Sequence, residues 1–357
     1  MTRWPYLLLC VLACVTLASA SYAQPGDGDY LDVSIRVFRS AEPQAPAATG
    51  DAAAPSSGPT VTPEVRAAET RYLPMFLRYR LEASGLFGAV RVLPEIDNSA
   101  QLTIEGTIER SDGAYLALDL VARDATGRVW IDRRYEGAAA PGVSAAGDAF
   151  AEDDFAWLFN AILRDLAAMH EALDAPQREE IRTVALLRYG RGLVPDSFSG
   201  YLRDNPDGTV SILRLPAADD PILQRIQQIR EHEYLFIDVV DEEYQRFFSN
   251  IKPVYDTWRD FQREQSSSAA DYTTRETTAS SAYARGSYYA LQESYNNYRW
   301  AKVQELYLDE LREGFANEVE PTELALENSL YKLTGTLEQQ YREWRSILAE
   351  LYALETR

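Results

Sequence analysis

Few side chains in this sequence are of types that could perform chemistry, since it contains only two histidines and two cysteines. His170 ends a predicted helix, where the helix dipole favours a cation, so we interpret it as a C-terminal cap. His232 stands within a predicted helix between Glu231 and Glu233, and no further ligand lies one turn away to complete a zinc site. We therefore predict that His232 faces solvent, and we predict no catalytic residue, no metal and no cofactor.

Carboxylates are abundant, with 55 Asp and Glu residues. The run Glu152–Asp154 begins a predicted helix, where acids complement the positive end of the helix dipole. The run Asp241–Glu243 predicts a solvent-facing helix surface. A glycosidase needs two carboxylates at a fixed separation in a cleft. We keep a carboxylate-based glycan hydrolase, or a cell-wall glycan-binding protein, as the alternative to a non-enzymatic function.

The sequence does not support a nucleic-acid-binding surface or a phosphate-binding loop. The formal net charge is −20, and the Lys and Arg residues form no cluster that could hold phosphates, so we predict no nucleic-acid partner. The segment Tyr189–Gly192 carries two glycines, but no Gly-Lys-Ser opens a helix after it. It predicts a helix end and turn rather than a phosphate-binding loop.

The first 23 residues have the three parts of a secretory signal peptide. Arg3 supplies the positive charge, the segment 7–17 is apolar apart from one threonine, and small residues follow. Cleavage after Ala20 or Ala23 fits this pattern. No apolar run long enough to span a membrane recurs later. We therefore expect an exported protein without a transmembrane span once the peptide is removed.

Both cysteines, Cys10 and Cys14, lie inside the signal segment. After plain cleavage the mature chain would contain no thiol, disulfide or cysteine-ligated metal. The residues 11–14, Val-Leu-Ala-Cys, also resemble a bacterial lipobox, which would make Cys14 a lipidated N-terminus and anchor the protein to a membrane. Both alternatives stay open on the sequence.

Residues 24–215 are predicted to form an α+β domain, in which an antiparallel sheet packs against helices. Period-two alternation predicts strands, and apolar residues at helical spacing predict helices. The segment 41–63 is rich in Ala, Pro, Gly and Ser and predicts a disordered loop. The expected strands are 30–38, 89–93, 101–109, 115–120 and 129–131, the expected helices are 62–84 and 149–172, and a helix and hairpin extension covers 177–215.

Part of this domain resembles a known envelope module. The residues 103–106, Thr-Ile-Glu-Gly, form a strand that ends in glycine, and the apolar strand 116–122 leads into Asp124-Ala125-Thr126-Gly127. This pattern is similar to the N-terminal domain of the TolB type and to the lipoprotein activators of penicillin-binding proteins, over about residues 30–172. The resemblance implies a periplasmic protein-interaction domain of a Gram-negative envelope, and it supplies no catalytic residue.

Residues 216–357 are predicted to be helical throughout, with the domain boundary near 216–220. Helices are expected at about 219–264, 282–318 and 321–355, with the Ser/Thr-rich stretch 265–281 as a polar connection. Short connections make neighbouring helices antiparallel, which favours an elongated three-helix bundle or coiled coil. The fold class expected for the whole chain is an α+β domain followed by this all-α part.

Aromatic residues are concentrated in the predicted helices, and the chain has 22 Tyr and 6 Trp. On the middle helix, apolar side chains cover a much wider arc than the stripe of an ordinary surface helix. One explanation is that the middle helix of three touches two neighbours. The other is that the face carrying Tyr289, Trp300 and Tyr307 binds a partner, because monomers seldom expose a large apolar patch.

The sequence thus favours an exported, non-enzymatic cell-envelope protein that acts as an interaction or assembly module. We expect it in the periplasm or associated with the outer membrane, with another envelope protein as its partner. The identity of that partner cannot be read from the residues.

Overall fold

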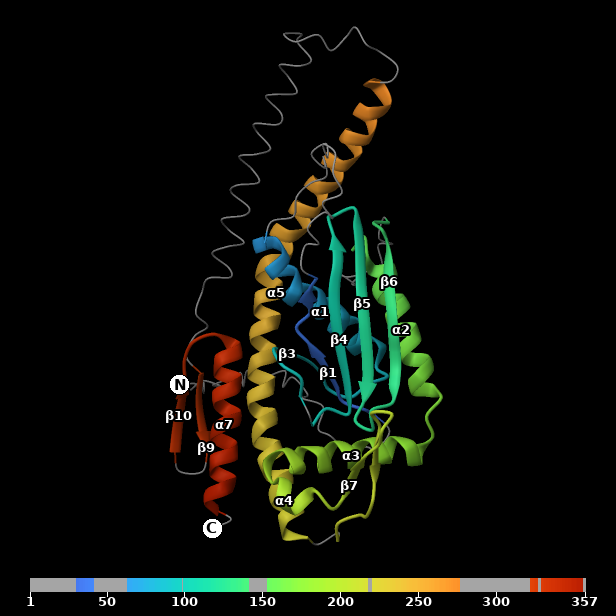
Figure 1. Ribbon diagram of the computed structural model, residues 1–357. Coiled ribbons are helices and arrows are strands. Elements are labelled where there is room, and N and C mark those ends of the chain that lie inside the picture. The colour runs from blue at the N-terminus through green and yellow to red at the C-terminus, as the bar shows by residue number, and fades with distance from the viewer. Residues whose placement is uncertain are drawn as a thin grey trace, which may run out of the picture.

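The computed structural model describes residues 30–41, 63–97, 99–140, 153–217, 220–276, 322–326 and 329–355. The first part of the chain forms a six-stranded sheet in the order β3-β1-β4-β5-β6, with β2 paired to β4 (Figure 1). The expected combination of a sheet region with helices, followed by further helices, is confirmed. The strands are β1 (Val33–Arg36), β2 (Arg39–Ser40), β3 (Val90–Leu93), β4 (Leu102–Ser111), β5 (Tyr115–Asp124) and β6 (Val129–Ala138).

The sheet is mixed, so the prediction of a purely antiparallel sheet is wrong. β1 runs parallel to both β3 and β4, with Val33 opposite Val90 and Leu102. Only β4, β5 and β6 form the antiparallel meander that the sequence predicts. The helix α1 (Pro63–Ser84) lies in the connection from the first strands to β3, and a helical crossover of this kind returns the chain in the same direction. Alternation of side chains identifies a strand but carries no information about its direction.

Two helices pack with this sheet. The predicted helix 62–84 is confirmed as α1, and α2 (Ala156–Glu171) begins later than the predicted residue 149. α2 contacts both β6 and α1, and the rings of Phe76 and Phe159 stack at 5.2 Å between their centroids. Residues 42–62, which cover almost all of the predicted loop, lie outside the described residues.

The predicted helix and hairpin extension is present, but its helix is longer than expected. α3 (Ala175–Leu193) begins with a capping box between Asp174 and Gln177 and is followed by the short α4 (Pro195–Phe198) and the hairpin of β7 (Leu202–Asp204) and β8 (Val210–Ile212). The predicted break at Tyr189–Gly192 is wrong, because these residues continue α3. Gly190 serves packing instead, since a Cβ there would lie 2.8 Å from the Phe198 ring.

The helix α5 (Pro221–Glu276) is 56 residues long and runs well past its predicted end at residue 264. The prediction of a polar connection is wrong for residues 265–276. That stretch is rich in Ser and Thr, but it contains no Gly or Pro, and weak helix formers alone do not end a helix that is already formed. Figure 1 shows α5 running alongside β3 and continuing beyond the ends of β4 and β5.

α5 also closes the edge of the sheet at β3. Asp241 accepts a hydrogen bond from the Val92 backbone N–H at 2.8 Å, and Arg78 donates to the Val90 carbonyl oxygen at 3.1 Å. Arg78 and Asp241 form an ion pair at 2.8 Å. The prediction that Asp241–Glu243 faces solvent is therefore wrong for Asp241, which is buried. Its carboxylate satisfies a strand edge that would otherwise be open.

The third predicted helix is replaced in its first part by a hairpin. β9 (Thr322–Leu326) and β10 (Ser329–Leu333) pair antiparallel, and α7 (Leu337–Glu355) follows after Gly335, whose φ is +99°. Leucines in this stretch fit a heptad, yet Leu324 and Leu326 also alternate as in a strand, so the spacing was ambiguous. The later part of the predicted helix is confirmed as α7. The predicted middle helix, 282–318, lies outside the described residues.

One apolar core includes elements from both sides of the predicted boundary at 216–220. Phe236, Tyr244, Phe248 and Trp258 of α5 belong to the same buried cluster as the sheet residues and the apolar face of α1. α5 packs against α1, β3, α3 and α7. The boundary therefore does not separate two cores. Within the described ranges, no helix combines the length and the apolar composition needed to cross a membrane.

Candidate functional site

The residues that the sequence singled out as partner-binding or lipidated do not belong to the described part of the chain. Tyr289, Trp300, Tyr307 and Cys14 all lie outside the described residues, as does the signal segment. His170 does lie in the last turn of α2 as predicted, and its ring meets the Phe87 ring edge-on at 5.3 Å. The candidate site must therefore be sought among groups that the sequence did not single out.

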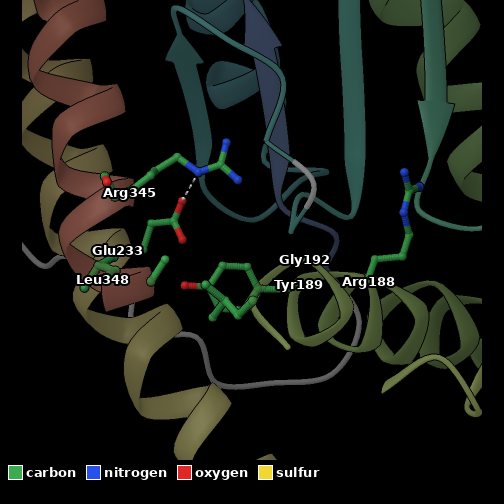
Figure 2. Close-up of a pocket in the computed structure, with 9 residues that line it drawn as sticks. Arg188, Tyr189, Gly192, Glu233, Arg345 and Leu348 are labelled. Carbon is green, nitrogen blue, oxygen red and sulfur yellow. Dashed lines mark ion pairs between the residues drawn. The ribbon is translucent and has the colours of Figure 1, made fainter. Parts of the chain in front are cut away.

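A cavity lies where α3, α5 and α7 meet. Its volume is about 250 Å³. Figure 2 shows the Glu233 carboxylate between the Arg345 guanidinium and the Tyr189 hydroxyl. The lining combines these polar groups with apolar and small side chains; its members are Arg188, Tyr189, Gly192, Leu193, Glu233, Arg345, Ser346, Leu348 and Ala349.

Apolar packing positions the polar residues that α5 and α7 contribute to the cavity. On α5, Glu233 follows Ile229 by one turn and precedes Phe236 by three residues, so it falls within the buried stripe. On α7, Trp344 packs near Phe236 with 5.8 Å between ring centroids, which places the next residue, Arg345, at the rim of the cavity. Glu233 and Arg345 are thereby held as an ion pair at 3.4 Å.

Glu233 is an unusual carboxylate in this setting. Only 3% of its surface is exposed. Burial, together with the nearby charge of Asp97, raises the pKa of Glu233 to about 7, although Arg345, Tyr189 and Arg230 act in the opposite direction. A group that titrates near neutrality beside a cavity is a frequent property of functional sites. His232, which the sequence predicts to face solvent, is half-buried, and its neighbour Glu233 is buried.

Several buried polar atoms around this carboxylate make no ordinary hydrogen bond. They include the Tyr189 hydroxyl and Glu233 Oε1, and on the facing helix α7 the Tyr341 hydroxyl and Trp344 Nε1. Burial and the Glu233 charge both raise the pKa of the Tyr189 hydroxyl, so it stays protonated and can donate a hydrogen bond. Buried polar groups are nearly always paired, and the two of these that line the cavity, Tyr189 and Glu233, therefore make it a candidate site.

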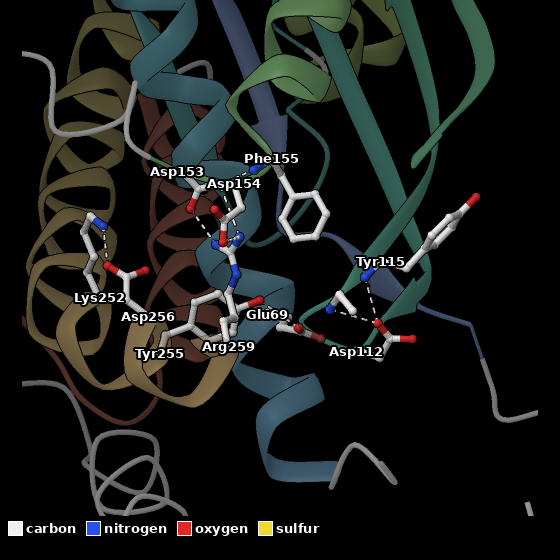
Figure 3. Close-up of polar contacts among 11 residues, drawn as sticks. Glu69, Asp112, Tyr115, Asp153, Asp154, Phe155, Lys252, Tyr255, Asp256 and Arg259 are labelled. Atoms are coloured by element: carbon white, nitrogen blue, oxygen red, sulfur yellow. Dashed lines mark hydrogen bonds and ion pairs between the residues drawn. The ribbon is translucent and has the colours of Figure 1, made fainter. Parts of the chain in front are cut away.

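A second buried polar cluster, which we call the Glu69 network, joins α1, β4, α5 and the start of α2 (Figure 3). Glu69 accepts hydrogen bonds from the Ser111 hydroxyl, from the Tyr255 hydroxyl at 2.8 Å and from Arg66 at 2.8 Å. Both of its oxygens therefore have partners. Burial raises the pKa of Glu69, and Arg66 opposes that shift.

The same network contains a buried ion pair. Arg259 of α5 binds Asp153 at 2.5 Å, and its guanidinium lies 4.7 Å from the centroid of the Phe155 ring. Asp153 also accepts from the Phe155 backbone N–H at 2.8 Å. The prediction that Glu152–Asp154 only complements a helix dipole is therefore wrong for Asp153. An acidic run gives no sign of a partner that lies 106 residues later in the chain.

The chemistry of the cavity does not match a two-carboxylate hydrolase. Among the described residues that line it, Glu233 is the one carboxylate, whereas glycosidases use a pair that flanks the scissile bond. Asp97 influences the pKa of Glu233 but does not line the cavity. Within the described ranges, no group of three metal-ligating side chains is present. The arrangement can donate and accept hydrogen bonds and can exchange a proton near neutral pH.

Comparisons with known proteins add little to this picture. No family model matches the chain, and no curated protein sequence matches it. Among solved structures, the PelC dodecamer from Paraburkholderia phytofirmans is similar over 39% of this chain and 89% of that chain, with 14% identity and a TM-score of 0.24. A likeness at that level carries no argument about fold or function.

Proposed function

We propose that this chain is an exported, non-enzymatic protein of the cell envelope that acts as an interaction or assembly module. The observation that carries the proposal is the course of α5. Its first two thirds are buried against the sheet region, whereas the helix continues to Glu276, past the ends of β4 and β5 (Figure 1). A helix of 56 residues is about 84 Å long, so it can present a surface at a distance from the core that anchors it.

The proposal extends to the part of the chain after α5. We propose that it completes an elongated helical bundle or coiled coil with α5 and α7, and that Tyr289, Trp300 and Tyr307 contact another envelope protein. The support is the wide apolar arc of residues 283–315 and the close packing of α5 with α7. The location, in the periplasm or at the outer membrane, rests on the signal segment 1–23.

Export has a direct test. Protein purified from envelope fractions should begin near Ser21 or Gln24, or at a lipidated Cys14, because the signal segment is removed on export. Mass spectrometry of the mature N-terminus distinguishes these products. Protein recovered only from the cytoplasm with Met1 intact would contradict export and, with it, the envelope function.

The partner surface can be tested at Trp300. A photoreactive phenylalanine analogue in place of Tyr307 should crosslink to one envelope protein in intact cells, and the same analogue at the exposed Arg203 of β7 should not. We expect Trp300→Ala to abolish this product while leaving the melting temperature near that of the native protein. A loss of about 3–5 kcal/mol in the free energy of unfolding would instead identify Trp300 as a core residue.

A further inference from the structure

The cavity between α3, α5 and α7 contains polar groups whose contacts within the described part of the protein are loose. The Tyr189 hydroxyl and Glu233 Oε1 are both buried, and neither makes a hydrogen bond of ordinary geometry. The Tyr189 hydroxyl interacts with the Glu233 carboxylate, and Glu233 Oε1 has its ion pair with Arg345 at 3.4 Å. Leaving a buried polar group unpaired is costly, and proteins retain such groups where something outside the chain pairs with them. The cavity itself, of about 250 Å³, is slightly below the size of a typical drug-sized pocket.

The charged and apolar residues that line the cavity indicate which class of ligand it can bind. Arg345 contacts Glu233 through Nε, and Figure 2 shows its two terminal nitrogens directed away from that carboxylate. A guanidinium with terminal nitrogens to offer is suited to a carboxylate. Leu193 and Leu348 form an apolar part of the wall. Arg188 takes little part, because its guanidinium donates to the Ala125 carbonyl oxygen at 2.9 Å.

We propose that this cavity is a binding site for a small organic monoanion, with a carboxylate held by Arg345, Tyr189 and Glu233 and an apolar body against Leu193 and Leu348. The site is independent of the proposed partner surface. Glu233 takes up a proton when the anion binds and donates a hydrogen bond to it. Without that proton, two carboxylates would face each other in a poorly solvated space.

Protonation of Glu233 costs little free energy near neutral pH. Burial raises the pKa of Glu233 to about 7, so near neutral pH about half of the protein already carries the proton. An ordinary glutamate, with a pKa near 4.3, would be protonated in well under 1% of molecules at that pH. The groups that face or act on Glu233 come from all the elements packed around it: Asp97 from the β3–β4 connection, Tyr189 from α3, Arg230 from α5, and Tyr341 and Arg345 from α7.

The test uses three probes of one shape and different charge, namely benzoate, benzamide and benzylamine. Binding to the full mature chain is measured by ligand-observed NMR at pH 6 and pH 8, where benzoate stays ionised. We expect benzoate to bind and the other two to bind at least tenfold more weakly. Because binding requires the protonated carboxyl, the benzoate Kd should rise about tenfold from pH 6 to pH 8.

Variants identify the groups responsible. Glu233→Gln should keep benzoate binding and lose its pH dependence, whereas the neighbouring exposed Glu231→Gln should behave like the native protein. Arg345→Leu, made in the Glu233→Gln background so that no unpaired acid is left buried, should abolish binding. Arg342→Leu on the same helix, where Arg342 pairs with Glu95 at the surface, is the matched control.

Several results would overturn the proposal. These are equal binding of benzoate and benzamide, which would indicate only apolar partition, and preferential binding of benzylamine, which would indicate a cation site. No benzoate binding at pH 6, or benzoate binding that survives loss of Arg345, would likewise overturn it. Circular dichroism on each variant shows whether the fold is intact.

Discussion

Two buried glutamates in this protein, Glu69 and Glu233, differ in how completely their carboxylate oxygens are hydrogen-bonded. Both are almost fully buried, and burial raises the pKa of each. Glu69 has hydrogen-bond partners on both oxygens, from Ser111, Tyr255 and Arg66. Glu233 Oε1 has only a long ion pair with Arg345 at 3.4 Å and no hydrogen bond of ordinary geometry. Burial alone therefore does not distinguish a structural acid from a candidate site; the completeness of its partners does.

The largest expected effect concerns the ion pair of the Glu69 network. Arg259→Ala should lower the free energy of unfolding by about 3–5 kcal/mol, because it leaves the buried Asp153 carboxylate without its cation. Urea denaturation measures the loss. The matched control is Arg246→Ala, which removes a surface pair with Glu243 and should cost less than about 1 kcal/mol. Similar small losses in both variants would mean that the network does not anchor α5.

A second prediction uses pH to separate the two glutamates. The pKa of Glu233 is about 7 in the folded protein against a reference of 4.5, so the native state binds its proton more tightly than the unfolded chain. The contribution of Glu233 to the free energy of unfolding therefore falls as pH rises from about 4.5 to about 7. Glu233→Gln should remove this fall and stabilise the protein at pH 8 by about 1–3 kcal/mol, with little gain at pH 5.

Glu69→Gln provides the contrast for that measurement. It disturbs hydrogen bonds that Ser111, Tyr255 and Arg66 donate to a carboxylate, so it should destabilise the protein at pH 8 as well as at pH 5. Denaturation curves for both variants at the two pH values measure these changes in the free energy of unfolding. The comparison fails if Glu69→Gln also stabilises at pH 8, or if the gain from Glu233→Gln is the same at both pH values.

The smallest expected effect compares two tyrosine hydroxyls. Tyr255→Phe removes a hydrogen bond of 2.8 Å to Glu69 and should cost about 1–2 kcal/mol. Tyr189→Phe removes a hydroxyl whose contact with Glu233 lacks ordinary hydrogen-bond geometry, and it should change stability by less than about 0.5 kcal/mol. Thermal unfolding of the two variants under identical conditions measures the difference. Equal losses would show that Tyr189 is as firmly paired as Tyr255.

Much of the local structure could be predicted from the residues. The meander of β4, β5 and β6, the helix α1 and the hairpin of β7 and β8 follow from side-chain periodicity and turn residues, which act over short distances. The hairpin of β9 and β10 could not be told from a helix, because Leu326, Leu330 and Leu333 also fit a heptad across both strands. The end of α5 was misplaced because a polar composition was taken as a break.

The candidate site was harder to predict than the fold. Glu233 carried one usable signal, its position between Ile229 and Phe236 in the apolar stripe of a helix. Its flanking residues Glu231 and His232 concealed that signal, because they made the segment look uniformly polar. Arg345 and Tyr189 carried no signal that would pair them with Glu233, since each lies on a different helix far away in the chain.

The sequence by itself determined where α1 and the strands of the meander form, because periodicity, capping residues and turn glycines act over a few residues. It also supports the expectation of export, which depends only on the composition of residues 1–23. The tertiary structure alone decided that β1 is parallel to its neighbours and that α5 shares the core of the sheet. It alone decided that Asp153 has a close ion pair with Arg259, whereas Glu233 has only the longer one with Arg345. These outcomes depend on groups far apart in the chain, whose approach is governed by the packing of the whole core rather than by any local pattern.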